Sequence, residues 1–266
     1  MTEQTAQPLR DSIVVIPALN EERAIRDVAV DALRYCEKVI VVDDGSSDRT
    51  SEVIADLPLE RIRHARPQGK ALALCDGFER ALELGAAGVL TMDGDGQHAA
   101  ADLPRLLAAA ERYPDHIVIG ARLVDKDTQP GKNRFGNQQA DFWVSWVCGQ
   151  RIVDTQSGQR YYPRAVIELA LTLPQHGFVF ESEILIEAAN RGIRAVSVPI
   201  KSSYEDDRRA SHFKPFRDVG RITRMIAGRL LRAGLMPRNY WRARTVPPII
   251  IDPPLGHAVI IDAPRL

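Results

Sequence analysis

Between residues 12 and 121, short β-branched runs alternate with longer segments of helical period, and this alternation limits the fold more than any other feature of the chain. It is typical of a mostly parallel sheet covered by helices. The expected strands are Ile13 to Ile16, Val39 to Val42, Ile62 to His64, Val89 to Met92 and Ile117 to Ala121, and the expected helices are Glu21 to Tyr35, Arg49 to Asp56, Gly69 to Leu84 and Ala99 to Tyr113. The sequence therefore predicts an α/β protein, in which ligands bind outside the carboxyl ends of the strands.

The alternation weakens after Ala121. A helix is expected at Glu181 to Arg191 and a strand at Ala195 to Ile200, which we interpret as an acceptor-side half packed on the same sheet. Trp143 and Trp146 are three residues apart on an expected helix, so packing in the core or toward a membrane is favoured over a sugar-stacking platform. The predicted organisation is a flexible N-terminus (1–11), one domain (12–207), a basic amphipathic helical segment (208–245) and a Pro-rich tail (246–266).

The tail contains two similar short segments, 250–252 and 260–262. Two such segments are too few for a repeat fold. They are interpreted as edge strands that pair with each other or exchange with a neighbouring chain, which would give a homo-oligomer.

The charge of the chain is unevenly distributed. Lys plus Arg and Asp plus Glu both number 35, so no strong global field attracts nucleic acid. Residues 208–244, however, carry 11 basic residues against Asp218 alone. Within Phe213 to Ala233, apolar residues share one helical face, and the opposite face carries Lys214, Arg217, Arg221 and Arg224. This segment is either a surface helix packed on the domain or an interfacial helix at an anionic membrane.

Three widely spaced cysteines, Cys36, Cys75 and Cys148, support neither a disulfide framework nor a zinc site, which favours a reducing, cytoplasmic setting. The first eleven residues lack the apolar run of a signal peptide, and no 18 apolar residues run together. The sequence therefore predicts a protein that does not span a membrane.

Carboxylates follow two of the expected strands. Asp43 and Asp44 lead into a turn, and Asp93 and Asp95 lie one residue apart after a buried strand. Alternate residues of an extended backbone point toward one site, and two close anions repel each other unless a cation neutralises them. Gln97 adds a neutral oxygen ligand and His98 a nitrogen ligand that suits manganese. The segment does not fit an EF-hand loop, which needs Gly at the position of His98.

Eight short motifs follow one another along the chain. They are Val15-Ile16-Pro17-Ala18-Leu19-Asn20-Glu21, Val41-Val42-Asp43-Asp44-Gly45-Ser46-Ser47-Asp48, Gly69-Lys70-Ala71, Met92-Asp93-Gly94-Asp95-Gly96-Gln97-His98, Gly120-Ala121-Arg122, Arg134-Phe135-Gly136-Asn137, Asp154-Thr155-Gln156-Ser157-Gly158 and Ser211-His212-Phe213. Together they resemble family-2 glycosyltransferases over about Ile13 to Ile226. The most similar branch is that of dolichol-phosphate mannose synthase and the bacterial polyprenyl-phosphate glycosyltransferases.

The resemblance implies a GT-A-type (Rossmann-like) fold that binds a nucleotide-sugar and a divalent metal, Mg²⁺ or Mn²⁺. The donor-binding residues that it implies are Pro17, Leu19, Glu21, Val42, Asp44, Lys70, Asp93, Gly94, Asp95, Arg208 and Arg209, and the metal ligands are Asp93, Asp95 and Gln97. The implied acceptor-phosphate residues are Arg122, Arg134, Ser211 and His212. Where the eukaryotic synthases have an Arg followed by a Ser-Lys pair, this chain has Arg208-Arg209-Ala210-Ser211-His212, so either Arg208 or Arg209 takes that role.

The expected reaction is inverting transfer of a sugar to a polyprenyl phosphate at the inner face of the membrane, with Asp95, Arg122 and Glu181 as catalytic residues. A phosphate acceptor is already anionic and needs mainly positioning, whereas a hydroxyl acceptor needs a general base, for which Glu181 and Glu183 are the candidates. Asp154 and Gln156 are either acceptor contacts or turn formers. Two alternatives stay open: a transferase for a soluble or glycan hydroxyl, and a non-catalytic nucleotide-sugar or membrane-binding protein.

Overall fold

The computed structural model describes residues 12–124, 131–174, 179–201, 224, 226–232 and 234–252. Arg208, Arg209, Ser211 and His212 lie outside the described residues, as do the N-terminus (1–11), most of the basic segment and the tail beyond residue 252. Arg134 lies in a described helix, but its side chain is outside the described part of the structure.

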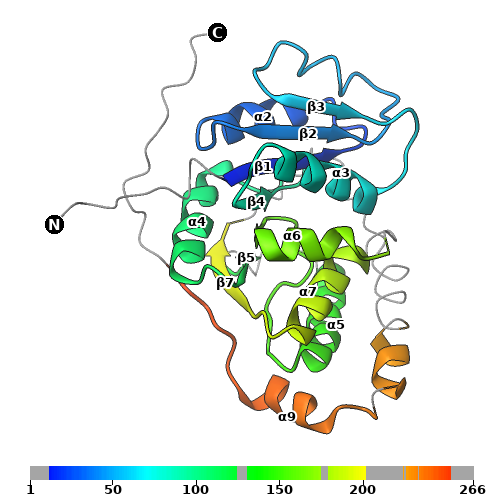
Figure 1. Cartoon of the computed structure of the whole chain (residues 1–266), viewed down its shortest axis with the longest axis vertical. Helices are drawn as coiled ribbons and strands as arrows, with labels where there is room; N and C mark the ends of the chain where they lie inside the picture. The colour runs from blue at the N-terminus through cyan, green and yellow to red at the C-terminus, as the bar shows by residue number, and fades with distance from the viewer. Residues whose placement is uncertain are drawn as a thin grey trace, which may run out of the picture.

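Seven strands form one sheet in the order β3-β2-β1-β4-β6-β5-β7 (Figure 1). Their bounds are β1 Ser12–Ala18, β2 Val39–Asp43, β3 Glu60–Arg63, β4 Gly88–Thr91, β5 Ile117–Arg122, β6 Arg160–Pro163 and β7 Ala195–Ile200. Only β6 runs antiparallel to its neighbours, β4 and β5, and all other pairs in this sheet are parallel. The prediction of an α/β protein with a mostly parallel sheet is confirmed.

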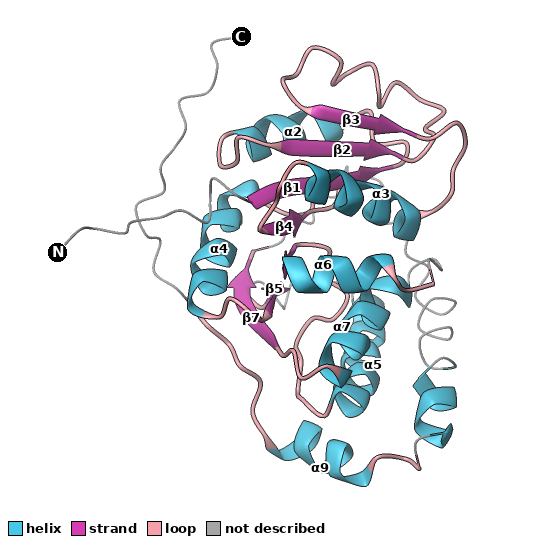
Figure 2. Ribbon diagram, in the orientation of Figure 1, coloured by secondary structure: helices cyan, strands magenta, loops and turns pink. Residues whose placement is uncertain are grey.

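Helices cover both faces of the sheet (Figure 2). They are α2 Ile25–Leu33, α3 Lys70–Glu83, the short 3-10 helix η1 Ala100–Asp102, α4 Leu103–Arg112, α5 Gly131–Cys148, α6 Arg164–Leu171, α7 Phe180–Asn190 and α9 Pro237–Thr245. Alternate residues of β1 enter two different cores, Ile13 and Val15 with α3, α5, α6 and α7, and Val14 and Ile16 with α2 and α4. Apolar residues on both sides of the strand explain why these runs are apolar without interruption.

The helix predicted for Arg49 to Asp56 is wrong, because residues 50–56 form turns. Asp48 Oδ1 accepts hydrogen bonds from both the backbone nitrogen and the hydroxyl of Thr50, at 2.9 and 2.5 Å. Side-chain bonds of this kind offer the backbone an alternative to the helical pattern.

The aromatic residues of α5 pack within the domain, as predicted. Trp143 and Trp146 stack with centroids 5.6 Å apart and an interplanar angle of 9°. Tyr240 of α9 lies 4.8 Å from Trp146, whose ring nitrogen donates to the carbonyl of Leu235. The aromatic cluster therefore joins α9 to the domain.

The C-terminal region follows the packing interpretation where it is described. Residues 224 and 226–232 are helical, and Ile226 and Leu230 are buried in the core. Ile250 forms an isolated parallel bridge with Ser197 of β7, so the first tail segment lies along the edge of its own chain's sheet without forming a strand, whereas 260–262 lies outside the described residues. No helix among the described residues is both long enough and apolar enough to cross a bilayer.

Candidate active site

The loops that follow β1 and β2 are bonded to each other. Asn20 has a φ of 57°, and its backbone N–H donates a hydrogen bond to the Ser46 hydroxyl at 2.9 Å. The Glu21 backbone nitrogen donates to the Thr50 hydroxyl at 2.8 Å. Pro17, Leu19 and Glu21 are partly exposed along this edge, as a donor pocket requires.

Two predicted donor residues are enclosed by the protein. Val42 is fully buried in the core on the α3 face, so its side chain does not reach solvent. Asp44 is 3% exposed, and its carboxylate accepts the backbone nitrogens of Gln68 and Gly69 at 2.8 and 2.7 Å. The Asp44 side chain therefore fixes the loop that precedes α3.

His64 lies between two carboxylates. Its Nδ1 is 2.7 Å from Asp44 and its Nε2 is 2.7 Å from Asp76. Burial disfavours the imidazolium, but the two hydrogen-bonded carboxylates outweigh burial and raise the pKa of His64. The contribution of protonated His64 to the stability of the fold is therefore fully present below the pKa of histidine in the unfolded chain. It is lost as the pH rises through the raised pKa of His64 in the folded protein.

We expect His64→Gln to lower the free energy of unfolding by about 2 kcal/mol at pH 6, because hydrogen bonds to charged groups are lost. The loss should be smaller at pH 9, because a higher pH favours the neutral imidazole and so weakens both charged hydrogen bonds. Urea denaturation at both pH values measures this difference. An equal loss at pH 6 and pH 9 would show that His64 acts without its charge.

The turn after β4 carries the paired carboxylates. Asp93, Asp95 and Gln97 are partly exposed, and the two glycines between them are buried in a turn rather than in extended backbone. A Cβ atom at Gly94 would lie 3.3 Å from the carbonyl oxygen of Pro17. The absence of a side chain at Gly94 therefore lets this turn pack closely against the end of β1.

Lys70, the first residue of α3, joins this turn to α7. Its Nζ lies 2.7 Å from Asp93 Oδ1 and 3.1 Å from Glu181 Oε2. Burial opposes the charged ammonium, but the carboxylates of Asp93 and Glu181 more than offset it and raise the pKa of Lys70. Residues 70, 93 and 181, far apart in sequence, thus form one charged group.

The environment of the two carboxylates separates their pKa values. Burial and the neighbouring charge of Asp93 raise the pKa of Asp95 to about 6. Burial also opposes ionisation of Asp93, but Lys70 outweighs it and lowers the pKa of Asp93 to about 2. The ionised form of Asp95 is thus disfavoured in the absence of a cation, and a bound cation would favour it.

The side chains around Asp93 and Asp95 determine which ligands a metal ion would find there. The described residues contain no group of three or more His, Cys, Asp or Glu side chains that could hold an ion. Burial lowers the pKa of His98 to about 4, so this imidazole is neutral, and its Nε2 is 3.9 Å from Asp93 Oδ2. Gln97 donates its backbone nitrogen to Asp95 Oδ1 at 3.0 Å. Two carboxylates fit a hard divalent cation whose other ligands are water or phosphate oxygens.

Gly158 contacts the site directly, although the sequence analysis named it only as the last residue of the motif 154–158 and gave it no role. A Cβ atom at this position would lie 2.1 Å from Asp93 Oδ2. The Gly158 carbonyl accepts the hydroxyl of Thr91 at 2.8 Å, which ties the loop to β4. Glycine is therefore required because the Asp93 carboxylate occupies the space of a side chain.

Arg122, at the end of β5, is held by Asp154. Its Nε and Nη2 lie 2.8 and 2.7 Å from the two carboxylate oxygens, and its backbone nitrogen donates to the same group at 2.8 Å. Asp154 has φ of 56°, and Asp141 Oδ2 of α5 accepts its backbone N–H at 3.0 Å. Asp154 therefore forms the turn and orients Arg122, whereas the Gln156 side chain bonds to the neighbouring Thr155.

Arg160, which was not identified from the sequence, holds the loop 154–158 in place beside the site. It is fully buried and donates to the carbonyls of Thr155, Ser157 and Glu181 at 2.7, 2.8 and 3.1 Å. These bonds fix the loop 154–158 against the start of α7. A lone Arg before two tyrosines gives no signal of this role in the sequence.

The two candidate bases point in different directions. Glu181 contacts Lys70, while Glu183 lies 3.8 Å from Arg229. Residues two apart on a helix do not share a face. The structure thus brings Glu181, and not Glu183, to the carboxylates after β4.

The chain is similar to known proteins over most of its length. The family model described as glycosyl transferase family 2 matches residues 13–168. A polyprenol monophosphomannose synthase of Mycolicibacterium smegmatis is 31% identical over 209 residues, covering 74% of this chain and 78% of the relative. A dolichyl-phosphate hexose transferase of Haloferax volcanii is 32% identical over 203 residues, covering 75% and 85%.

Solved structures share the fold at lower identity. Glucosyl-3-phosphoglycerate synthase from Mycobacterium tuberculosis, in complex with Mn²⁺, UDP and glucosyl-3-phosphoglycerate, superposes with a TM-score of 0.62 at 22% identity, covering 85% of this chain and 81% of that one. Mannosyl-3-phosphoglycerate synthase from Rubrobacter xylanophilus gives 0.64 at 20% identity, covering 85% and 75%. The GT-A fold expected from the sequence is confirmed. The chain is a glycosyltransferase that belongs to family 2, with relatives in the polyprenyl-phosphate branch.

Proposed function

We propose that the chain transfers a sugar from a nucleotide-sugar to a polyprenyl phosphate with inversion at the sugar carbon. The observation that carries this proposal is the group formed by Lys70, Asp93 and Glu181. It joins the donor side of the sheet to α7, close to the loop that holds Arg122. The names of the relatives give the acceptor class.

Donor binding is assigned to the edge formed by the loops after β1, β2 and β4. Pro17, Leu19 and Glu21 would line the nucleotide, with Val42 and Asp44 supporting that edge from within. Asp93 and Asp95, with Gln97, would hold Mg²⁺ or Mn²⁺, which when bound neutralises charge on the departing diphosphate. Arg208 and Arg209 are proposed as further donor contacts.

The acceptor is better matched by a phosphate than by a hydroxyl. Glu181 is paired with the Lys70 ammonium at 3.1 Å, so its carboxylate already has a partner within the site. A phosphate needs no general base, and its attacking oxygen needs only positioning by cations. Arg122 is oriented for this by Asp154, and Arg134, Ser211 and His212 are proposed to complete the phosphate site.

Binding of the donor is tested by a thermal-shift screen of nucleoside diphosphates and nucleotide-sugars, each with and without Mn²⁺. A ligand at 100 times its Kd stabilises the folded protein by about 2.7 kcal/mol. We expect one nucleotide to raise the Tm, and to do so more strongly with Mn²⁺. A screen in which no nucleotide raises the Tm would contradict the donor site.

We also propose peripheral binding at the inner face of the membrane. Leu231, Leu235 and Trp241 expose 72%, 53% and 67% of their surface, and α9 carries Arg238 and Arg242 beside Trp241. Exposed apolar residues next to cations suit an anionic bilayer surface. Tail exchange between neighbouring chains stays a prediction.

Reversing two charges on α9 tests this surface. Because each basic residue near an anionic membrane contributes about 1 kcal/mol, the double variant Arg238→Glu and Arg242→Glu should bind vesicles containing phosphatidylserine at least about tenfold more weakly. Sedimentation with liposomes measures the binding. The matched control reverses Arg61 and Arg112, which are exposed on β3 and α4. Equal loss in both double variants would exclude a specific α9 surface.

A further inference from the structure

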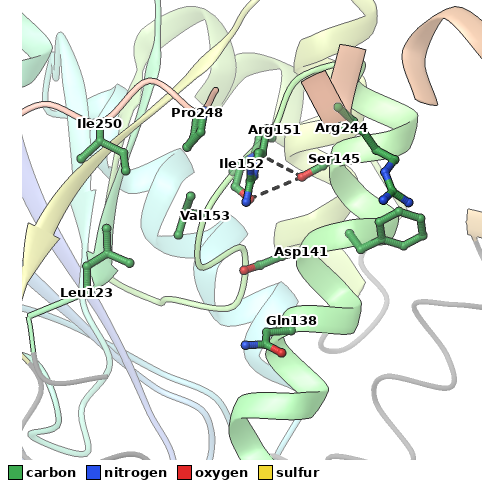
Figure 3. Close-up of a pocket in the computed structure, with 12 residues that line it drawn as sticks. Leu123, Gln138, Asp141, Ser145, Arg151, Ile152, Val153, Arg244, Pro248 and Ile250 are labelled. Atoms are coloured by element: carbon green, nitrogen blue, oxygen red, sulfur yellow. Dashed lines mark hydrogen bonds between the residues drawn. The ribbon is translucent and has the colours of Figure 1, made fainter. Parts of the chain in front are cut away.

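Helix α5 holds the loop that follows it at two points, one helical turn apart (Figure 3). Near the C-terminal end of the helix, the Ser145 hydroxyl accepts the backbone N–H of Ile152 at 2.9 Å. One turn earlier, Asp141 Oδ1 accepts the backbone N–H and the hydroxyl of Thr155, both at 2.7 Å. Asp141 Oδ2 accepts the backbone N–H of Asp154 at 3.0 Å. Positions four apart share a helical face, so both side chains of α5 reach the same loop.

The two contacts differ in what lies beyond them. Ser145 holds Ile152, whose side chain is buried in the core. Asp141 holds Asp154, whose two carboxylate oxygens bind Arg122 at 2.7 and 2.8 Å. Because Asp154 adopts a φ of 56°, which is unfavourable for most residues other than glycine, its position depends on bonds from the surrounding protein. A chain of contacts thus runs from α5 through Asp154 to the guanidinium at the end of β5.

Asp141 lies among charged groups and helps to line a pocket of about 620 Å³. Three donors point at its two oxygens, an arrangement that an ionised carboxylate satisfies best. Burial and the neighbouring charge of Asp154 oppose ionisation and raise the pKa of Asp141 to about 6. Arg122 from β5 is paired with Asp154, while Arg151 and Arg244 line the same pocket and are exposed. The charge of Asp141 therefore changes between pH 5 and pH 8.

We propose that the ionised carboxylate of Asp141 is a positioning group for the acceptor, because it holds Asp154 so that Arg122 faces the acceptor phosphate. The inference rests on the proposed function and adds to it a residue that acts through Asp154 and Arg122. An oxygen of Asp141 that carries a proton accepts fewer hydrogen bonds, so protonation loosens the turn at Asp154 and the guanidinium loses its orientation. Binding of the acceptor then weakens, whereas binding of the donor does not.

Asp141→Asn tests this role, because asparagine keeps the shape of aspartate but has one acceptor oxygen and no charge. The acceptor in the assay is farnesyl phosphate, a short polyprenyl phosphate. At pH 8 the variant should raise the KM for this acceptor at least about tenfold and leave the KM for the donor unchanged. In an Arg122→Ala background the same substitution should change the acceptor KM less than about twofold, because its effect passes through Arg122.

The pH dependence of the variant separates positioning from support of the fold. Wild-type Asp141 is itself neutral at low pH, so the ratio of the acceptor KM values of variant and wild type should fall toward one at pH 5. Titration of the acceptor phosphate affects both proteins alike and cancels in this ratio.

Stability should change in the opposite direction. Because the pKa of Asp141 is raised in the folded protein, its contribution to stability is fully present below the pKa of the unfolded chain and is lost as the pH rises through about 6. Asp141→Asn should therefore gain stability relative to the wild type from pH 5 to pH 8. Urea denaturation at both pH values measures this change.

The matched control is Ser145→Ala, which removes the other contact between α5 and the loop. It should lower the Tm and leave the acceptor KM unchanged, because Ser145 does not hold Asp154. If melting curves show that Asp141→Asn fails to fold, Thr155→Val carries the test. It removes one of the three donors to Asp141 and should raise the acceptor KM about threefold.

The outcomes separate the two proposals. The positioning role is overturned, and the proposed function left standing, by an acceptor KM that Asp141→Asn leaves unchanged or by a KM ratio that is equal at pH 5 and pH 8. An equal rise of the acceptor KM in Ser145→Ala also overturns it, since any loosening of the loop would then suffice. A wild type that transfers no sugar to farnesyl phosphate overturns the proposed function and this inference with it.

Discussion

Asp95→Ala is expected to lower metal-dependent turnover of the donor at least about 1,000-fold, roughly 4 kcal/mol, while the protein stays folded. Asp95 has a raised pKa because burial and Asp93 oppose its charge, so its removal relieves repulsion in the metal-free protein. The loss therefore falls on metal and diphosphate binding. Release of nucleoside diphosphate with Mn²⁺ and the Tm of the variant measure the two effects.

The control for this variant is Asp27→Ala, which removes a carboxylate from the first turn of α2, outside the site. Its turnover should match that of the wild type. Unchanged turnover in Asp95→Ala would show that Asp95 does not hold a metal ion that the reaction needs. A collapse of the Tm would assign Asp95 a structural role.

Gly158→Ala should reduce turnover at least about 100-fold and lower stability by roughly 2 kcal/mol. The added methyl group would lie 2.1 Å from Asp93 Oδ2, so the carboxylate must move and its contact with Lys70 is disturbed. Steady-state kinetics and urea denaturation measure these effects. Because the methyl acts through Asp93, it should cost much less activity in an Asp93→Ala background.

Gly228→Ala provides the matched control. Gly228 lies in a helical segment, and a Cβ atom there would meet only the end of Arg232, at 3.7 Å. Alanine favours a helix over glycine by up to about 1 kcal/mol, so this variant should keep its activity and gain stability. Wild-type turnover in Gly158→Ala would mean that the position of Asp93 is not critical.

The sequence indicated those parts of the fold that depend on local pattern. Strands such as β1 and β2 are buried on both faces, so their apolar runs are continuous and easily identified. Strand β6 was missed because its first residue is Arg160, whose charge is accommodated by the carbonyl groups of Thr155 in the preceding loop and of Glu181 in α7. The helix expected at 49–56 failed because Asp48 and Thr50 bond locally.

The site was predictable in part for the same reason. Asp93 and Asp95 stand out in the sequence because two carboxylates follow one strand, and both are partly exposed in the turn after β4. The contacts of Lys70 with Asp93 and Glu181 depend on how α3, β4 and α7 pack together. Gly158 is required by the space that Asp93 fills, and spacing along one sequence does not encode such a contact.

The central claim is most directly tested by incubating the wild-type protein with the nucleotide-sugar identified in the thermal-shift screen, Mn²⁺ and a polyprenyl phosphate. We expect release of nucleoside diphosphate only when the lipid phosphate is present, together with a lipid-linked sugar of inverted anomeric configuration. Transfer that requires a hydroxyl acceptor and ignores the lipid phosphate would contradict the account.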